Sequence, residues 1–219
     1  MSNFIDLNSI QWAEFTIGKI FQVSRGKRLI EKDRIKGNVP YYSASASNNG
    51  LTDLIQNPLF IEKDCIIITT FCDSYYVKGE FTASDEISIL KNEFLTEFSG
   101  KFISKMIIAN REKFAFGYKA FTERIKRQII QLPVNSNGYP DYEFMDNYTR
   151  QKESEQIAKF TSYINARLEK VKNFREVPKL ENKKWNEFFI EDIFHIKAGK
   201  RLTKADMIKG ETPFIGASD

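Results

Sequence analysis

The first part of the chain carries apolar patterns that are typical of short strands around one helix. Apolar and polar residues alternate over residues 15–26, and the run CIIITTF at 65–71 is rich in β-branched residues. Similar runs at 81–91 and 128–134 are predicted to be strands, and the segment from Asn38 predicts a strand that enters a polar loop. Between them, residues 93–116 show helical spacing. These patterns predict a mixed α/β unit with a mixed or antiparallel sheet.

A different pattern begins after a turn-rich hinge at residues 134–144. From Tyr148 to Phe174 there is no Gly or Pro, charges are dense, and apolar residues recur in steps of three and four. This predicts one helix of roughly 25 residues, about 38 Å long at 1.5 Å per residue. Its apolar stripe resembles a coiled-coil seam and must pack on something. The residues of this predicted dimer or subunit interface are Ile157, Phe160, Ile164, Leu168 and Val171.

The end of the chain repeats its beginning. The stretch WAEFTIGKIFQVSRGKRL from Trp12 aligns without a gap with WNEFFIEDIFHIKAGKRL from Trp185. About half of the positions in 12–46 are identical in 185–219, far above the chance level of roughly one in twenty. The chain is therefore predicted to contain a globular unit at 1–150, a long helix at 151–176, and at 177–219 a linker with the start of a second unit.

Composition and charge narrow the class of protein. A hydrophobic content of 42% over 219 residues is enough for a core, and no run approaches the roughly 18 apolar residues of a membrane span. We expect a cytoplasmic protein with reduced thiols at Cys65 and Cys72. The net charge of +4 permits a polyanionic partner. Lys and Arg cluster at 25–36 and 119–127, and a fold that brings both clusters to one side would form a phosphate-contacting surface.

Three polar loops supply side chains that can hydrogen-bond base edges and phosphates. They read SASASNNG, TTFCDSYYVKG and FGYKAFTERIKR, and their combination on a basic, repeated unit favours DNA binding. Lys27 and Arg28 are shared by both copies of the repeat, which favours phosphate contact or common architecture over base reading. The residues expected to contact bases or backbone are Ser43, Ser45, Asn48, Asn49, Ser74, Tyr75, Tyr76, Lys78, Lys119 and Arg124.

The sequence does not assemble an active site of its own. The run Asn57-Pro58-Leu59-Phe60 lacks the third-position Pro of the motif that holds a target amine, and no Gly-rich strand-to-helix turn follows to bind S-adenosylmethionine. The two cysteines are too few for a zinc cage. We therefore predict no catalytic residue, no metal and no bound cofactor. A complete single-chain nuclease or methylase remains an alternative, which activity of the pure chain would support.

Several ordered motifs together span nearly the whole chain. They are Trp-x-Glu-Phe-x-Ile-x-x-Ile-Phe at 12–21, Gly-Lys-Arg-Leu at 26–29, Pro-Tyr-Tyr-Ser-Ala-Ser at 40–45 leading to Asn-Asn-Gly at 48–50, Phe-Thr-Ala-Ser-Asp at 81–85, Ile-Gln-Leu-Pro at 130–133, and Gly-Tyr-Pro-Asp-Tyr-Glu-Phe-Met at 138–145. In this order, and with the internal repeat, they resemble the specificity subunit of type I restriction and modification systems and the related recognition domains of type IIB and IIG enzymes.

This resemblance implies a function and a set of partners. In that family each target-recognition domain reads one half of a split DNA site, and long helices set the spacing and dock methyltransferase subunits. The implied partners are double-stranded DNA, methyltransferase subunits and a restriction subunit, with S-adenosylmethionine, ATP and Mg²⁺ on those subunits. The chain itself would direct adenine methylation without catalysing it.

The resemblance also leaves choices about assembly. A complete subunit would hold a second recognition domain and a second helix, so we expect a chain truncated after the first domain and central helix. Its apolar stripe would then pair with a second copy, giving a homodimer that reads a palindromic split site. The alternatives are an anti-restriction decoy or structural protein that occupies the methyltransferase subunits, and a recognition domain from a type IIB or IIG enzyme.

Overall fold

The computed structural model describes residues 7–114, 117–172 and 179–211, together with 213 and 215. The chain divides into two units, Met1–Arg167 and Leu168–Asp219. Within the described residues, no helix has the length and apolar character needed to cross a membrane.

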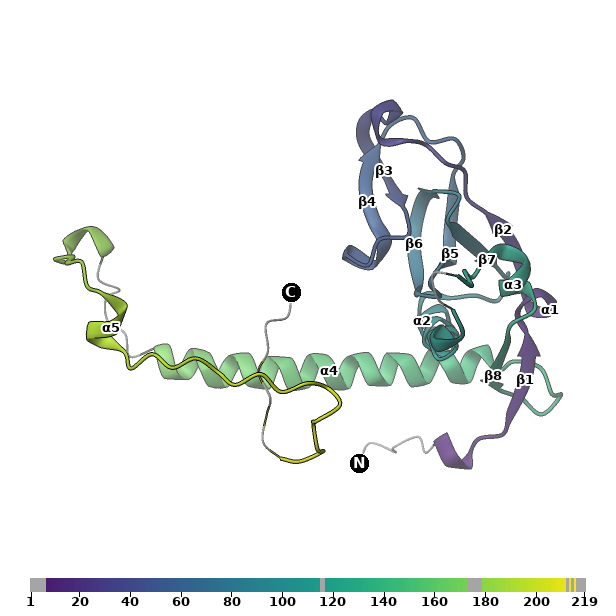
Figure 1. Cartoon of the computed structure of the whole chain (residues 1–219). Coiled ribbons are helices and arrows are strands. Elements are labelled where there is room, and N and C mark those ends of the chain that lie inside the picture. Colours follow the sequence, from purple (N-terminus) through teal and green to yellow (C-terminus); the bar gives the residue numbers. More distant parts are fainter. Residues whose placement is uncertain (1–6, 115–116, 173–178, 212, 214, 216–219) are drawn as a thin grey trace. The chain divides into compact units, whose positions relative to one another are not determined.

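Most strands of the first unit form one six-stranded mixed sheet (Figure 1). All neighbours in it pair antiparallel except β3 and β6, which pair parallel. A separate antiparallel pair joins the two ends of the domain. In sheet order the six strands are β2 (Gln22–Arg25), β7 (Ile87–Lys91), β5 (Glu62–Thr69), β6 (Ser74–Ala83), β3 (Lys36–Tyr42) and β4 (Leu51–Ile55), and the separate pair is β1 (Trp12–Thr16) with β8 (Ile129–Pro133). The predicted mixed α/β fold is confirmed.

The two longest described helices are α2, with 12 residues, and α4, with 30 residues. The helix α2 begins at a capping box, in which the backbone N–H of Ser99 donates to Thr96 Oγ1 (3.2 Å) and the N–H of Thr96 donates to Ser99 Oγ (3.0 Å). The helix predicted at 93–116 is therefore shorter at both ends. The helices are α1 (Ile17–Ile20), α2 (Glu97–Ile108), α3 (Thr122–Lys126), α4 (Tyr142–Val171) and α5 (Ile190–Ile193), with single 3₁₀ turns at Leu7–Ser9, Glu31–Asp33, Asn48–Gly50, Arg111–Lys113 and Leu180–Asn182.

The central strand β5 is buried on both faces. Ile66 and Ile68 face a core that includes α2, β1, β8 and the start of α4, whereas Cys65 and Ile67 face a second core with Phe81 and residues of β7. A strand covered on both sides needs no polar alternation, which explains the uninterrupted apolar run CIIIT.

The register of β6 against β5 shifts between Lys63 and Cys65, so β6 carries a β-bulge at 78–79 opposite Asp64, and such a bulge bends its strand. Asp64 and Gly79 both have left-handed backbone conformations (φ 52° and 78°), and the N–H of Gly79 donates to Asp64 Oδ1 at 2.8 Å. Beyond the bend, Ala83 accepts a hydrogen bond from the N–H of Lys27 at 2.9 Å. The stretch 81–91, predicted as one strand, is thus the end of β6, a turn at 84–86, and β7.

The helix α4 begins at Tyr142, nine residues before the predicted start at 151. The carboxylate of Asp141 accepts a hydrogen bond from the N–H of Phe144 (2.9 Å) and caps the first turn. Met145 is fully buried in the core. Residues 142–144, which were expected to belong to a hinge, are therefore helical because the start of α4 packs on the domain through Met145. The described helix ends at Val171, and residues 173–176 of the predicted helix lie outside the described residues.

The second copy of the repeat keeps the local structure of the first. The indole N–H of Trp185 donates to the carbonyl of Leu180 (3.0 Å), as Trp12 does to Leu7 (3.2 Å), so the structural repeat begins five residues upstream of the tryptophans. Helix α5 corresponds to α1. Trp185 is 72% exposed, however, and the described part of the second unit contains no strand. We conclude that β1 is a strand because it pairs with β8. The similar local sequence of the second copy does not form a strand in the described residues.

Candidate nucleic-acid interface

Loops from four parts of the first unit meet at the turn 84–86. The guanidinium of Arg25 contacts Asp85, with Nη2 3.4 Å from Oδ2, and Lys119 Nζ lies 3.3 Å from Glu86 Oε1. The N–H of Ser84 donates to the carbonyl of Tyr42 at 2.8 Å, immediately before the loop 43–50. We call residues 25–34, 43–50, 84–86 and 117–124 the loop edge. The fold thus brings both predicted basic clusters to one side.

A glycine allows this convergence. Gly26 passes so close to the turn that a Cβ atom built on it would lie 2.2 Å from the carbonyl oxygen of Ser84. A side chain at this position would displace the backbone of one segment or the other. The same glycine recurs in the second copy as Gly199, where nothing lies within 4 Å of a built Cβ. The glycine of the Gly-Lys-Arg-Leu motif therefore has a structural role at position 26, where it allows two backbone segments to approach closely.

A polar cavity of about 260 Å³ opens within the loop edge. Arg34 lies beside it, with its guanidinium carbon 4.3 Å from the ring centroid of Tyr41 and its Nε donating to the carbonyl of Leu29 at 3.1 Å. Arg34 also pairs with Asp53, with Nη1 3.7 Å from Oδ2. The fixed guanidinium and the neighbouring hydroxyl of Ser43 suit a hydrogen-bonding ligand such as a base edge. The lining residues are Arg28, Leu29, Ile30, Glu31, Arg34, Tyr41, Ser43, Ser84, Asp85 and Glu86.

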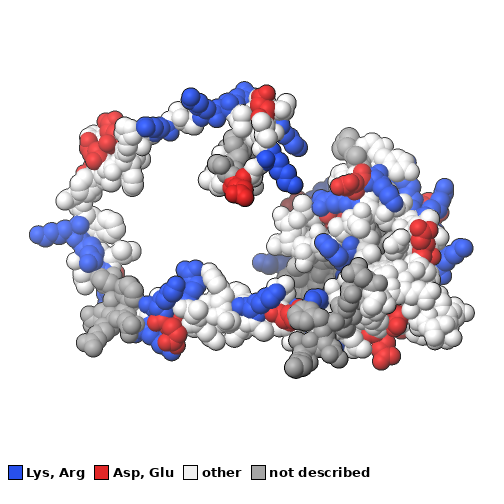
Figure 2. Space-filling view, turned by 90° about the horizontal axis from the view of Figure 1, so that it is seen from below, with Lys and Arg blue, Asp and Glu red and all other residues white. Residues whose placement is uncertain are grey.

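The charge of the loop edge is mixed. Its segments contain seven Lys or Arg and five Asp or Glu, and Figure 2 shows basic and acidic side chains interspersed over the face of the domain seen there. Lys27 and Arg28 are exposed and form no ion pair within the described residues. They are thus available for phosphates, whereas Arg25 and Lys119 would have to leave carboxylate partners.

Five of the predicted contact residues lie together on the loop edge. Asn48 and Asn49 are exposed and take left-handed conformations (φ 50° and 53°), which asparagine tolerates better than most residues. Ser43 Oγ is hydrogen-bonded to Thr52 Oγ1 (2.6 Å), and Ser45 Oγ accepts from the N–H of Ser47 (3.2 Å). Lys119 shares this edge through its contact with the turn. Internal bonds therefore shape the loop while the asparagine amides remain free to bind.

Arg124 also belongs to the loop edge, but its guanidinium is already engaged. Its Nη1 donates to the carbonyl of Lys119 at 2.7 Å, and its Cζ lies 3.9 Å from the ring centroid of Tyr118. These contacts leave the outer side of the guanidinium for a phosphate.

Residues 74–79 of the stretch 69–79, predicted to be a polar loop, belong to strand β6. Ser74 is 2% exposed. Tyr76 packs against Gly100 of α2 and the first core, and Tyr75 is half-buried against the second core. Lys78 remains exposed and forms an ion pair with Glu97 at the start of α2 (2.8 Å). The pairing of β6 with β5 thus buries Ser74 and partly buries both tyrosines, whereas Lys78 stays at the surface.

Tyr118 and Phe121 are loop-edge residues that sequence reasoning did not single out, whereas Arg25 and Arg34 were expected only as members of the basic cluster 25–36. Tyr118 and Phe121 are exposed aromatic residues next to the predicted Lys119. The signal was present in the stretch FGYKAFTERIKR, where aromatic and basic residues alternate.

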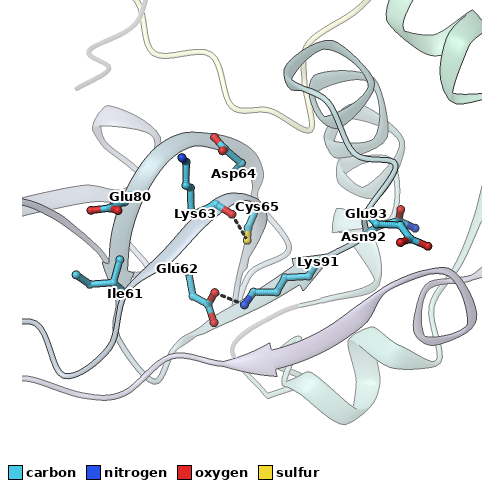
Figure 3. A pocket seen from close by; sticks show the side chains of 9 residues that line it. All are labelled: Ile61, Glu62, Lys63, Asp64, Cys65, Glu80, Lys91, Asn92 and Glu93. Atoms are coloured by element: carbon cyan, nitrogen blue, oxygen red, sulfur yellow. Dashed lines mark hydrogen bonds and ion pairs between the residues drawn. The ribbon is translucent and has the colours of Figure 1, made fainter.

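A larger cavity of about 530 Å³ lies near the bend of β6 (Figure 3). Its lining includes the carboxylates Glu62, Asp64, Glu80 and Glu93 against Lys63 and Lys91, and Lys91 is paired with Glu62. None of the residues that line this cavity belongs to the loop edge. In the described part of the chain, no group of His, Cys, Asp or Glu side chains could hold a metal ion.

Both cysteines are free and buried. Burial raises the pKa of each thiol to about 11, which keeps the thiols protonated and unreactive at neutral pH. The expectation of reduced thiols agrees with this environment.

Residues 9–161 match the family described as Type I restriction modification DNA specificity domain. The chain belongs to this family and contains a target-recognition domain of a specificity subunit. Domains of this family recognise DNA and are not themselves catalytic.

The chain is also similar to a curated relative and to solved structures. The chain is 31% identical over 169 residues to the specificity subunit of the type II restriction enzyme BgcI, S.BcgI, from Heyndrickxia coagulans, covering 74% of this chain and 49% of the relative. A solved chain of a type I restriction and modification system has a TM-score of 0.52 at 12% identity, over 78% of this chain and 46% of that one. The S subunit from M. genitalium has a TM-score of 0.47 at 17% identity, over 76% and 42%. The chain spans about half the length of these relatives.

Proposed function

We propose that this chain is the sequence-reading component of a type I restriction and modification complex. The observation that carries the proposal is the convergence of polar and basic loops at the turn 84–86. Partner subunits methylate adenine and cleave DNA, and S-adenosylmethionine, ATP and Mg²⁺ bind to those partners. The match of residues 9–161 to the DNA specificity domain of type I restriction and modification systems supports these partners.

Recognition of DNA combines two kinds of contact, to phosphates and to base edges. Lys27, Arg28 and Lys119 bind phosphates, which supplies affinity and register but no sequence information. Asn48 and Asn49, at the tip of the loop 43–50, read base edges, because an asparagine amide pairs in bidentate fashion with adenine in the major groove.

The long helix of this chain pairs with a second copy. Phe160 is 64% exposed, and Ile157, Leu168 and Val171 on the same helix are also more than half exposed. Leaving four large apolar side chains in water is unfavourable, and a symmetric pair of helices would bury them. A C2 dimer would then present two identical loop edges to a palindromic split site.

Sequencing of methylated adenine in cells that express this chain with its cognate methyltransferase subunit tests the proposal. A new palindromic split motif is the expected result. An asymmetric motif would refute the homodimer while keeping the recognition role, and no methylation despite a formed complex would refute the recognition role and favour a decoy.

Two matched variants connect that experiment to the structure. Asn48→Ala with Asn49→Ala should relax or abolish the motif, whereas Asn137→Ala, an exposed asparagine outside the loop edge, should leave it unchanged. Phe160→Glu should convert a dimer to a monomer in sedimentation, because it places a carboxylate in the apolar seam.

A further inference from the structure

Two exposed aromatic side chains project from the basic loop 117–124. Tyr118 is 51% exposed and Phe121 is 44% exposed. Each has a guanidinium over its ring, with Arg124 Cζ 3.9 Å from the centroid of Tyr118 and Arg25 Cζ 5.7 Å from that of Phe121. The inner side of Tyr118 stacks on the buried ring of Phe114 (6.0 Å, 17° between planes). The loop thus presents rings and cations in alternation.

The loop is held firmly at buried points between these rings. The N–H of Ala120 donates to the carbonyl of Thr70 (2.8 Å), and Ala120 and Ile125 are fully buried. The carbonyl of Phe121 accepts hydrogen bonds from the N–H groups of Arg124 (2.8 Å) and Ile125 (3.0 Å). An anchored loop loses little conformational entropy when its rings enter a binding partner, so the aromatic area is available for affinity.

The surroundings identify the chemistry of the partner. Arg124, Arg25 and Phe114 cover ring faces, so the exposed edges of the two rings are the parts that can contact nucleobases. Cations beside exposed aromatic side chains bind the phosphates on either side of such bases. Lys119, between the two rings in sequence, reaches the turn at Glu86 and adds a third cation. Tyr139 offers a contrast: it is even more exposed, at 69%, but it lies outside the loop edge, and no cation among the described residues lies over its ring.

We propose that Tyr118 and Phe121 form an aromatic wedge that inserts against a base step of the bound DNA, with Arg25, Lys119 and Arg124 on the flanking phosphates. The wedge rests on the proposed function, because it requires that the loop edge faces DNA. An inserted side chain must partly unstack the base step, and that cost falls where the step is already weakened.

The test uses the full chain in its complex and duplexes that contain the recognition motif, either intact or with one abasic site moved step by step along it. Wild-type protein should bind about tenfold more tightly when the abasic site lies at the wedge step. The double variant Tyr118→Ala/Phe121→Ala should lose about tenfold on the intact duplex and should gain nothing from any abasic site. Tyr139→Ala should behave as wild type.

A salt titration separates stacking from charge. The double variant should keep the wild-type slope of log K against log salt, whereas Lys119→Ala should lower that slope by about one. Retained abasic enhancement, or wild-type affinity in a double variant with a wild-type circular dichroism spectrum, would overturn the wedge alone. Absence of motif-selective binding by the wild-type complex would overturn the proposed function and the wedge together.

Discussion

Lys101 Nζ lies 3.0 Å from Glu153 Oε1 and so joins α2 to the long helix α4. The same Nζ is 2.9 Å from Glu97 of its own helix. Nearby, the guanidinium carbon of Arg150 lies 3.8 Å from the ring centroid of Phe98. Met145 is also buried in the first core, so the first turns of α4 belong to the recognition domain.

Met145 should contribute more to this junction than the ion pair above it. Met145→Ala removes a fully buried side chain and should lower the free energy of unfolding by about 2–5 kcal/mol. Glu153→Gln breaks a partly exposed ion pair and should change it by less than about 1 kcal/mol. Urea unfolding followed by circular dichroism measures both. An equal effect of the two variants would contradict the packing account.

The two copies of the repeat allow a matched test of the close approach at Gly26. Gly26→Ala should destabilise the domain by at least about 2 kcal/mol, because its Cβ would collide with the Ser84 carbonyl. Gly199→Ala places the same atom in open space and should leave stability within about 0.5 kcal/mol of wild type. Thermal unfolding of both variants decides the matter, and a harmless Gly26→Ala would show that the turn 84–86 can move away.

Stability should decrease at alkaline pH because of the buried thiols. Burial raises the pKa of Cys72 to about 11 from its ordinary value of 9.0, so the folded protein keeps a proton that the unfolded chain releases. The contribution of the protonated Cys72 thiol to the free energy of unfolding is therefore fully present below pH 9. It is lost as the pH rises through about 11. Urea midpoints measured from pH 8 to 11 should fall less steeply in Cys72→Ala. Parallel pH profiles of the two proteins would contradict this prediction.

Glu97 should affect the stability of the protein at acidic pH. Hydrogen bonds from Lys78 and Lys101 lower the pKa of its carboxyl to about 2 from 4.5. Its contribution to stability is present above pH 4.5 and is lost as the pH falls toward 2. Glu97→Gln should flatten that part of the stability profile, with a loss at pH 7 below about 1 kcal/mol because the pairs are partly exposed. Glu31→Gln, an exposed carboxylate without an ion pair in the described residues, is the control and should retain the acid slope.

The sequence alone was sufficient for features that depend on local periodicity and self-similarity. The apolar run of β5, the long helix with Phe160 on its exposed stripe and the repeat at Trp12 and Trp185 could all be predicted. The residues that carry the family resemblance were also evident without coordinates. The spacing of apolar residues along a strand or helix and the identity between two copies of a repeat can be read from the sequence alone. Neither requires knowledge of contacts between distant segments.

Long-range pairing decided the rest. The pairing of β6 with β5 buries Ser74, the bend at Gly79 brings Ala83 to the loop after β2, and packing of Met145 moves the start of α4 to Tyr142. The repeat shows the same division within one molecule, because Trp12 lies in a strand against β8 while Trp185 keeps only the local turn. Local hydrogen bonds form from nearby residues, but a strand and a binding edge exist only when distant segments supply their partners.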